Sequence, residues 1–221
     1  MAENLPVNFP IPGESSIASY DWVDVANGTG YIRYYLNVAC TGTGTQGYTL
    51  SESGIYSNVV AWQSAALTTN ANTEVFNNIF VTTLNSPKTI NGNALVNIAA
   101  KLGGLEASRM YHGVEIIKIS GGAETILGHA SGALIIGTAA TPPVMDHENV
   151  SLISIPITKT HLKKGDQVGI RLHTYAWKTA ASTPSLMYIG LDPMNRTSSL
   201  TGPNILTTTN SIVNLPVELD L

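Results

Sequence analysis

Charged side chains are scarce in this sequence. Asp, Glu, Lys and Arg make up 12% of its 221 residues, against about 25% in a typical soluble domain, and Thr, Ser, Asn and Gly fill the polar positions instead. The net charge is -4, and the basic residues are spread along the chain apart from Lys163 and Lys164. Proteins that bind nucleic acid or an anionic membrane carry a basic patch. We therefore expect neither partner.

Cysteine and long apolar runs are also missing. Cys40 is the single cysteine, so no disulfide can form within the chain. The first 16 residues lack the basic and apolar regions of a signal peptide, and no stretch approaches the roughly 20 apolar residues of a membrane span. We expect no signal peptide and no membrane segment, with stability that comes from packing or assembly.

The sequence shows almost no helical periodicity, and what it has instead is a pattern of strands. Short apolar and β-branched runs separated by Gly, Asn, Ser or Pro clusters are typical of an all-β sandwich. We predict strands at Tyr31 to Ala39, Val75 to Leu84, Thr89 to Leu102, Tyr111 to Ile119, Thr125 to Ala130, Val150 to Ile157, Gln167 to Trp177 and Leu186 to Leu191.

Alternation and turn residues indicate antiparallel strands on one core. Apolar residues occupy every second position of 94–102, and Val168, Ile170 and Leu172 alternate with Gly169, Arg171 and His173. The pairs Asn91-Gly92 and Gly121-Gly122 and the segment 164–166 offer the positive φ that tight turns need. We expect consecutive strands to pair mostly as neighbours.

The two ends of the chain differ from the middle. Residues 1–30 are predicted to form an extended arm and anchoring segment, because Pro6, Pro10 and Pro12 cannot enter a sheet interior. The sandwich is placed at 31–193 and a tail at 194–221, whose run from Ile212 to Leu219 is able to add an edge strand or reach a neighbouring subunit. The predicted interface residues of the arm are Leu5, Val7, Phe9, Ile11 and Trp22.

No sequence motif of an enzyme is present. The patterns GxSxG, HExxH, GxxxxGK[ST], CxxC and GxGxxG are absent, and the histidines are scattered. We predict a protein that is not an enzyme and has no cofactor. A hydrolase without a recognisable motif is the alternative.

Two groups of residues are weak candidates for a site. Asp146, His147 and Glu148 offer ligands for a cation such as calcium but lack the alternate acidic spacing and the glycine of a calcium loop, so we expect a solvated loop and no metal. Tyr175 and Trp177 are two residues apart on one strand face and could stack against a sugar, although core packing is more frequent for such a pair. Trp62 is a further aromatic candidate.

Several segments carry a resemblance to a known group of proteins. They are PIPGESSIASYDWVDVANGTGY in the arm, SGIYSN at 53–58, LNSPKTINGNALVNIAAKL, SLISIPITKTHLKKGDQVGIRLHTYAW and LMYIGLDPMNR. In this order they resemble virion structural proteins of tailed bacteriophages, over about residues 5–196. The resemblance implies a jelly-roll-like β-sandwich with an N-terminal arm, located in the virion.

The expected function follows from this resemblance. We expect a decoration or cement protein on the exterior of a phage head, with the major capsid protein or other virion proteins as partners. A homo-oligomer is expected, with a trimer as the first choice and a dimer as the next. The alternative is a receptor- or carbohydrate-binding tail or fibre module.

Overall fold

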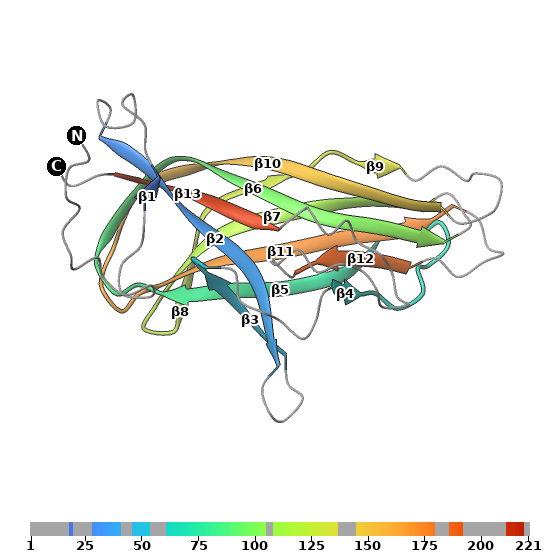
Figure 1. Ribbon diagram of the computed structural model, residues 1–221, viewed down its shortest axis with the longest axis horizontal. Helices are drawn as coiled ribbons and strands as arrows, with labels where there is room; N and C mark the ends of the chain where they lie inside the picture. Colours follow the sequence, from blue (N-terminus) through green and yellow to red (C-terminus); the bar gives the residue numbers. More distant parts are fainter. Residues whose placement is uncertain are drawn as a thin grey trace, which may run out of the picture.

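The chain forms an all-β, jelly-roll-like β-sandwich, as predicted (Figure 1). The computed structural model describes residues 18–19, 28–40, 46–53, 61–104, 108–136, 145–179, 186–191 and 211–218. Within these ranges there are strands and no helix. The strands are β1 (Ala18–Ser19), β2 (Thr29–Cys40), β3 (Gln46–Ser51), β4 (Ala61–Gln63), β5 (Thr73–Thr83), β6 (Lys88–Gly104), β7 (Ser108–Ser120), β8 (Ala123–Ser131), β9 (Ile135–Ile136), β10 (Met145–Leu162), β11 (Gln167–Lys178), β12 (Leu186–Gly190) and β13 (Ile212–Glu218).

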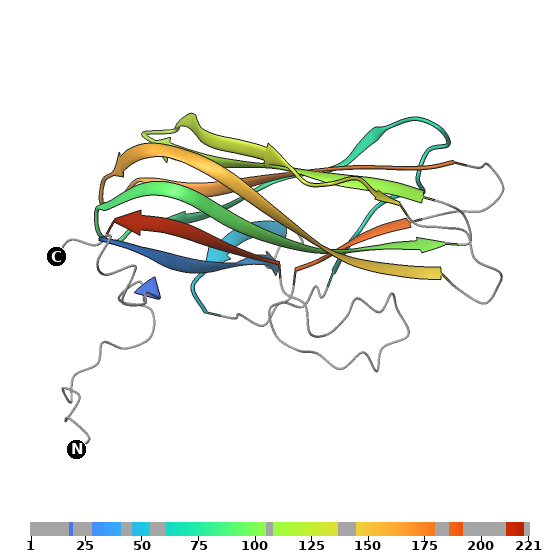
Figure 2. The same cartoon turned by 90° about the horizontal axis from the view of Figure 1, so that it is seen from above.

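One continuous sheet folds over itself to make two layers (Figure 2). The first layer runs β10-β6-β13-β2, and the second runs β5-β11-β7-β8. Strand β3 joins the layers, because it pairs with β2 along its length and with β5 at Thr49 and Val81. Strands β12 and β4 extend the first layer beside β6, and β9 adds to β7. This is the double-sheet arrangement of a jelly roll.

Many connections cross from one layer to the other, and among consecutive strands only β1–β2, β2–β3 and β7–β8 of the described residues pair, so the expectation that consecutive strands mostly pair as neighbours is wrong. Strand β6 lies between β10 and β13, and β11 lies between β5 and β7. A tight hairpin is kept between β7 and β8, where Gly121 and Gly122 have φ values of 57° and 84°. Crossing is favoured because each layer has one apolar face, and alternate connections place the two faces against each other.

The core lies between the layers and follows the predicted alternation. Strand β6 contributes Ala94, Val96, Ile98, Ala100 and Leu102, which are all buried. On the second layer, the core-facing residues of β11 are Val168, Ile170, Leu172, Thr174 and Ala176. Full burial of each large apolar side chain contributes roughly 1.5 to 3 kcal/mol, so the alternation fixes which face of each layer turns inward.

Strand β13 is a central strand, which corrects the prediction that 212–219 adds an edge strand or reaches a neighbour. It is hydrogen-bonded to β2 on one side and to β6 on the other, and Val213, Leu215 and Val217 are buried. A proline disfavours a central position because it lacks a backbone N–H. The ladder to β6 shifts register between Asn214 and Val217, which leaves Pro216 out of that ladder.

Asn91 and Gly92 lie inside β6, in agreement with the predicted strand from Thr89 to Leu102 and not with the turn that the Asn-Gly pair indicated. Gly92 has the expected positive φ, at 113°, but the strand continues through it. A Cβ atom at this position would lie 3.5 Å from the Cβ of Pro216. The glycine therefore allows a local distortion of β6 next to the proline of β13, which is where the two strands lose register.

Asp166 holds the turn between β10 and β11 against the hairpin of β7 and β8. Its carboxylate accepts hydrogen bonds from the backbone N–H of Lys163 at 2.9 Å and from the Ser120 hydroxyl at 2.8 Å, and lies 3.1 Å from Lys118 Nζ. Together these interactions lower the pKa of Asp166 to about 2, and the hydrogen bond from the Lys163 N–H contributes most to this shift. The predicted turn at 164–166 is confirmed, with a φ of 89° at Gly165.

The outer strands of the two layers, β8 and β10, come together at one edge of the sandwich without pairing in the sheet (Figure 2). We call this edge the seam. At Gly128 of β8, an added Cβ would lie 2.3 Å from the carbonyl oxygen of Pro156 on β10, and at Gly132 it would lie 3.2 Å from Ile153 Cδ1. The seam closes this tightly because these two positions carry no side chain.

We predict that Gly128→Ala lowers the free energy of unfolding by about 1 to 3 kcal/mol, because the methyl group overlaps the Pro156 backbone. Gly113→Ala is the matched control, since its Cβ would meet no atom nearer than 3.6 Å. Alanine there should be neutral or slightly stabilising because it restricts the unfolded chain. Urea denaturation of both variants checks this, and equal stability of the two would contradict the close approach at the seam.

Candidate functional site

The outer face of the second layer gathers polar and aromatic side chains. Because the even-numbered residues of β11 face the core, Arg171, His173, Tyr175 and Trp177 point outward and are partly exposed. Strands β5 and β7 flank β11 and add their own outward residues opposite this row. We call this surface the polar–aromatic face.

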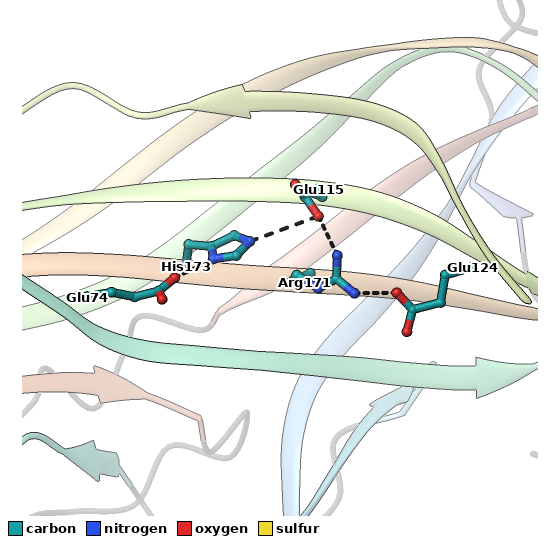
Figure 3. Close-up of polar contacts among 5 residues, drawn as sticks. All are labelled: Glu74, Glu115, Glu124, Arg171 and His173. Atoms are coloured by element: carbon teal, nitrogen blue, oxygen red, sulfur yellow. Dashed lines mark hydrogen bonds and ion pairs between the residues drawn. The ribbon is translucent and has the colours of Figure 1, made fainter.

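Hydrogen bonds and ion pairs cross the polar–aromatic face from strand to strand (Figure 3). The guanidinium of Arg171 donates to Glu115 on β7 at 2.8 Å and to Glu124 on β8. The imidazole Nδ1 of His173 lies 2.6 Å from Glu74 on β5, and its Nε2 lies 3.9 Å from Glu115. Each side chain of this group is therefore held by contacts from at least one neighbouring strand.

The network is acidic and holds Arg171 charged. Burial works against the charged guanidinium, but hydrogen bonds and charges from Glu115 and Glu124 outweigh it and raise the pKa of Arg171. The carboxylates of Glu74, Glu115 and Glu124 face one arginine and one histidine. Arg109 of β7 lies opposite Trp177 on the same face, so three carboxylates stand against two arginines and the electrostatic preference for cationic over anionic molecules is small.

A cluster of aromatic side chains lies further along β11, beyond His173. Tyr111 of β7 stacks on Tyr175 with ring centroids 4.9 Å apart and an angle of 11° between the planes. Trp177 meets Tyr111 edge to face at 6.4 Å, and Asn72 Nδ2 donates to the Tyr111 hydroxyl at 3.2 Å. Burial, followed by the charge of Glu74, raises the pKa of Tyr175, so its hydroxyl stays protonated at neutral pH.

An open hollow of about 600 Å³ lies beside this cluster, at the edge of β5. Its lining combines phenol, amide, guanidinium, imidazole and aliphatic groups, from Tyr48, Asn77, Asn78, Ile79, Arg171 and His173. Small-molecule sites have volumes of about 300 to 1,000 Å³ and combine apolar walls with a few polar groups. The volume of the hollow lies in this range, but the hollow is open and four of its six lining residues are polar, so it suits a ligand rich in hydroxyl groups better than an apolar one.

His112 is buried on the core side of β7, behind the polar–aromatic face. Its Nδ1 lies 2.9 Å from the hydroxyl of Thr174, and within the described residues its Nε2 has no hydrogen-bond partner. Burial lowers the pKa of His112 to about 4, so the imidazole is neutral at pH 7. His112 therefore packs in the core as a neutral side chain and becomes charged only in acid.

A second surface follows the seam. In the described part of the chain, every exposed large apolar side chain lies on β8, β9 or β10 or in the loop between β8 and β9. We call these residues the seam strip: Ile126, Leu134, Ile136, Val150 and Leu152. The exposed fraction reaches 67% at Leu152. Strands β8 and β10, which carry three of these residues, lie together at the seam, and exposed apolar patches mark interaction sites.

The structure places some of the predicted site residues and not others. Tyr175 and Trp177 lie on the polar–aromatic face, whereas Trp62 packs edge to face on Phe76 at 4.8 Å against the core. The arm residues Leu5, Val7, Phe9, Ile11 and Trp22 lie outside the described residues.

The segment with Asp146, His147 and Glu148 belongs to β10 and pairs with Gly103, Leu102 and Lys101 of β6. The predicted solvated loop is therefore wrong, because the β10 ladder extends to Met145. No group of three or more metal-ligating side chains occurs in the described ranges. The same ranges contain no helix that is long and apolar enough to cross a membrane.

Sequence reasoning missed Tyr111, Glu115 and Glu74. Glu74 and His173 are 99 residues apart in the chain, and Arg171 and Glu115 are 56 apart. The available signal was the alternation of 109–119, which puts Tyr111 and Glu115 on one face of the predicted strand. Strand pairing, which the sequence does not specify, was needed to bring them to β11.

Comparison with known proteins gives no family. No protein family model matches the chain, and no curated protein matches it. Several solved structures are similar. A CocE/NonD family hydrolase from Staphylococcus aureus has 13% sequence identity and a TM-score of 0.47, over 86% of this chain and 37% of that chain.

Two further structures are similar to the same extent. An alpha-amino acid ester hydrolase has 13% identity and a TM-score of 0.49, over 84% of this chain and 36% of that chain. An aminopeptidase from a marine sediment Thaumarchaeota archaeon has 11% identity and a TM-score of 0.46, over 87% and 37%. The chain thus spans a little over a third of the length of each, and no substrate or catalytic residue is carried over from them.

These neighbours contradict the prediction that the chain is not an enzyme, since all three are hydrolases or peptidases by name. That prediction rested on missing sequence motifs, and motifs report only residues close together in the chain. Contacts such as those of His173 with Glu74 and Glu115 join separate strands, where a motif search does not find them. We therefore withdraw the exclusion of enzymatic activity.

We predict that acid destabilises the fold between pH 6.5 and about 4 through His112. The unfolded chain takes up a proton near the ordinary pKa of 6.5, whereas folded His112 stays neutral down to about 4. The contribution of neutral His112 to the free energy of unfolding is therefore fully present above pH 6.5. It decreases by up to about 3 kcal/mol as the pH drops to 4.

Urea denaturation across this pH range measures the loss. His112→Leu should flatten the curve, and the matched control His129→Gln, at an exposed position, should follow the parent protein. The same pH slope in His112→Leu as in the parent would show that His112 is not the acid-sensitive group.

Proposed function

We propose that this chain is a virion protein of a tailed bacteriophage, and more narrowly a decoration or cement protein on the exterior of the head. The observation that carries the proposal is the seam strip, which places exposed apolar side chains on the strands beside the seam. Leu152, Val150 and Ile136 are 67%, 43% and 54% exposed. Such side chains lose contact with water when a neighbouring subunit covers them.

The sequence resemblance supports the same assignment. The segments that resemble phage virion proteins include those that form β6, β10 and β11, which are long strands of the two layers. A jelly roll is a fold used by viral capsid domains. A fold alone does not fix a function, and the seam strip together with the resemblance is what favours a virion protein.

The charge of the chain suits the outside of a head. The net charge is -4, and the polar–aromatic face has carboxylates in excess. A protein that lines packaged DNA needs lysine and arginine to neutralise phosphates. An exterior position, on the major capsid protein or other virion proteins, has no such requirement.

The proposal includes a homo-oligomer, with a trimer as the first choice. A symmetric assembly of identical subunits repeats the same patch at each interface, and the seam strip is a patch that this assembly covers. The alternative function is a receptor-binding tail or fibre module, for which the polar–aromatic face is the favouring observation. The two functions differ in copy number and in position on the particle.

We predict that the chain is present at a copy number comparable to that of the major capsid protein in purified particles of its phage. Quantitative mass spectrometry of those particles measures it. Only a few copies in each particle would exclude a decoration role and favour the tail or fibre module.

We also predict that Leu152→Asn weakens self-association of the purified protein and its incorporation into particles, because an amide replaces an exposed apolar contact. Light scattering measures the first and mass spectrometry of particles the second. Ser154→Asn is the matched control, since it places the same amide at an exposed position of β10 and leaves the seam strip intact. Equal assembly of the two variants would show that the strip is not an interface.

A further inference from the structure

We propose that the polar–aromatic face is a binding site for a neutral glycan, seated in the hollow beside β5 and extending along β11 toward Tyr175. This site does not depend on the location of the chain in a particle. It is carried by three features: the hollow, the ordered aromatic rings beside it and the carboxylate partners that its basic side chains already have.

The hollow offers the mixed chemistry that a sugar needs. A sugar ring has apolar C–H faces and a rim of hydroxyl groups that both donate and accept hydrogen bonds. Ile79 and the ring of Tyr48 give the hollow apolar surface, and Asn77 supplies an amide that can donate and accept. The volume of about 600 Å³ and the open mouth leave room for a chain of sugar units to continue outside it.

The aromatic rings continue the site along β11. His173 lines the hollow, and Tyr175 is the next outward residue of the same strand, about 7 Å further on. Tyr175 is fixed by stacking on Tyr111, which Asn72 holds through its hydroxyl. Because these rings are already ordered, binding costs little additional side-chain entropy.

The polar groups of the site are ordered in the same way. Glu115 bridges Arg171 and His173, and Glu74 holds the other nitrogen of His173 (Figure 3). Each carboxylate has about four lone-pair positions, so these pairs leave acceptors for sugar hydroxyl groups. Pre-placed hydrogen-bond partners are what give a polar site its specificity.

Charge selects the class of glycan. Arg171 and His173, the basic side chains that line the hollow, already contact Glu74, Glu115 and Glu124, so a sialic acid, uronic acid, sulfate or phosphate group would have to compete with these carboxylates. Neutral hexoses and N-acetylhexosamines meet no such competition. The site is therefore assigned to uncharged sugar units.

The test is binding of the purified full chain to a panel of oligosaccharides. The panel contains uncharged members ending in glucose, galactose, mannose or N-acetylglucosamine, with sialylated and sulfated members beside them. Isothermal titration measures affinity, and Trp177 near the site makes fluorescence a second readout. We expect one or more uncharged oligosaccharides to bind with a Kd of roughly micromolar to millimolar, with little change at high salt because the ligand carries no charge.

Variants locate the site. Asn77→Ala changes an exposed side chain of the hollow, and Tyr175→Ala removes the ring beyond it; each should weaken binding about tenfold or more. Asn149→Ala is the matched control, because Asn149 is also an exposed asparagine and lies on β10 in the other layer, and it should bind as the parent does. Thermal unfolding of each variant reports whether the fold is kept, and Asn77→Ala remains decisive if Tyr175→Ala unfolds.

Three results would overturn the proposal. One is no binding of any uncharged oligosaccharide at about 10 mM, well above the expected Kd. Another is binding of the sialylated or sulfated members alone. The third is binding that Asn77→Ala and Asn149→Ala leave equally unchanged.

Discussion

The alternation of β11 is the constraint on which the rest of the structure depends. This strand lies between β5 and β7, and its even-numbered residues from Val168 to Ala176 face the core. The odd-numbered residues, Arg171 and His173 among them, face outward and contact carboxylates of β5, β7 and β8. A slip of one residue would turn these polar side chains into the apolar core. The burial of the core therefore also positions the polar–aromatic face.

The jelly-roll connections give the two surfaces different neighbours. The polar–aromatic face belongs to the second layer, while the seam strip lies where β8 and β9 of that layer approach β10 of the first. Gly128 and Gly132 allow this approach, because a side chain at either would meet Pro156 or Ile153. A molecule that covers the seam strip can therefore leave much of β11 accessible. Assembly through the seam and binding of a glycan at β11 are compatible roles for one chain.

The sequence predicted where most strands lie, but it did not predict which strands pair with each other. Alternation placed 167–177 and 89–102 close to the observed β11 and β6, since side chains on one face of a strand recur at every second residue. It did not place β13 at the centre of the first layer, because Pro216 is typical of an edge and the compensating distortion at Gly92 is in another strand. It suggested Tyr175 and Trp177 but missed Tyr111 and Glu115, whose roles depend on cross-strand pairing. Short strands such as β9, with two residues, have too few positions for alternation to be recognised.

The central claim is that the chain decorates the head through the seam strip and keeps β11 accessible. A reconstruction of the phage particle by electron cryo-microscopy tests it most directly. The account predicts density for the jelly roll on the outer surface of the head, with Leu152 and Val150 covered by a neighbouring subunit and the outer face of β5, β11 and β7 toward solvent. A head without this density, or subunits that leave the seam strip in solvent and cover β11 instead, would contradict it.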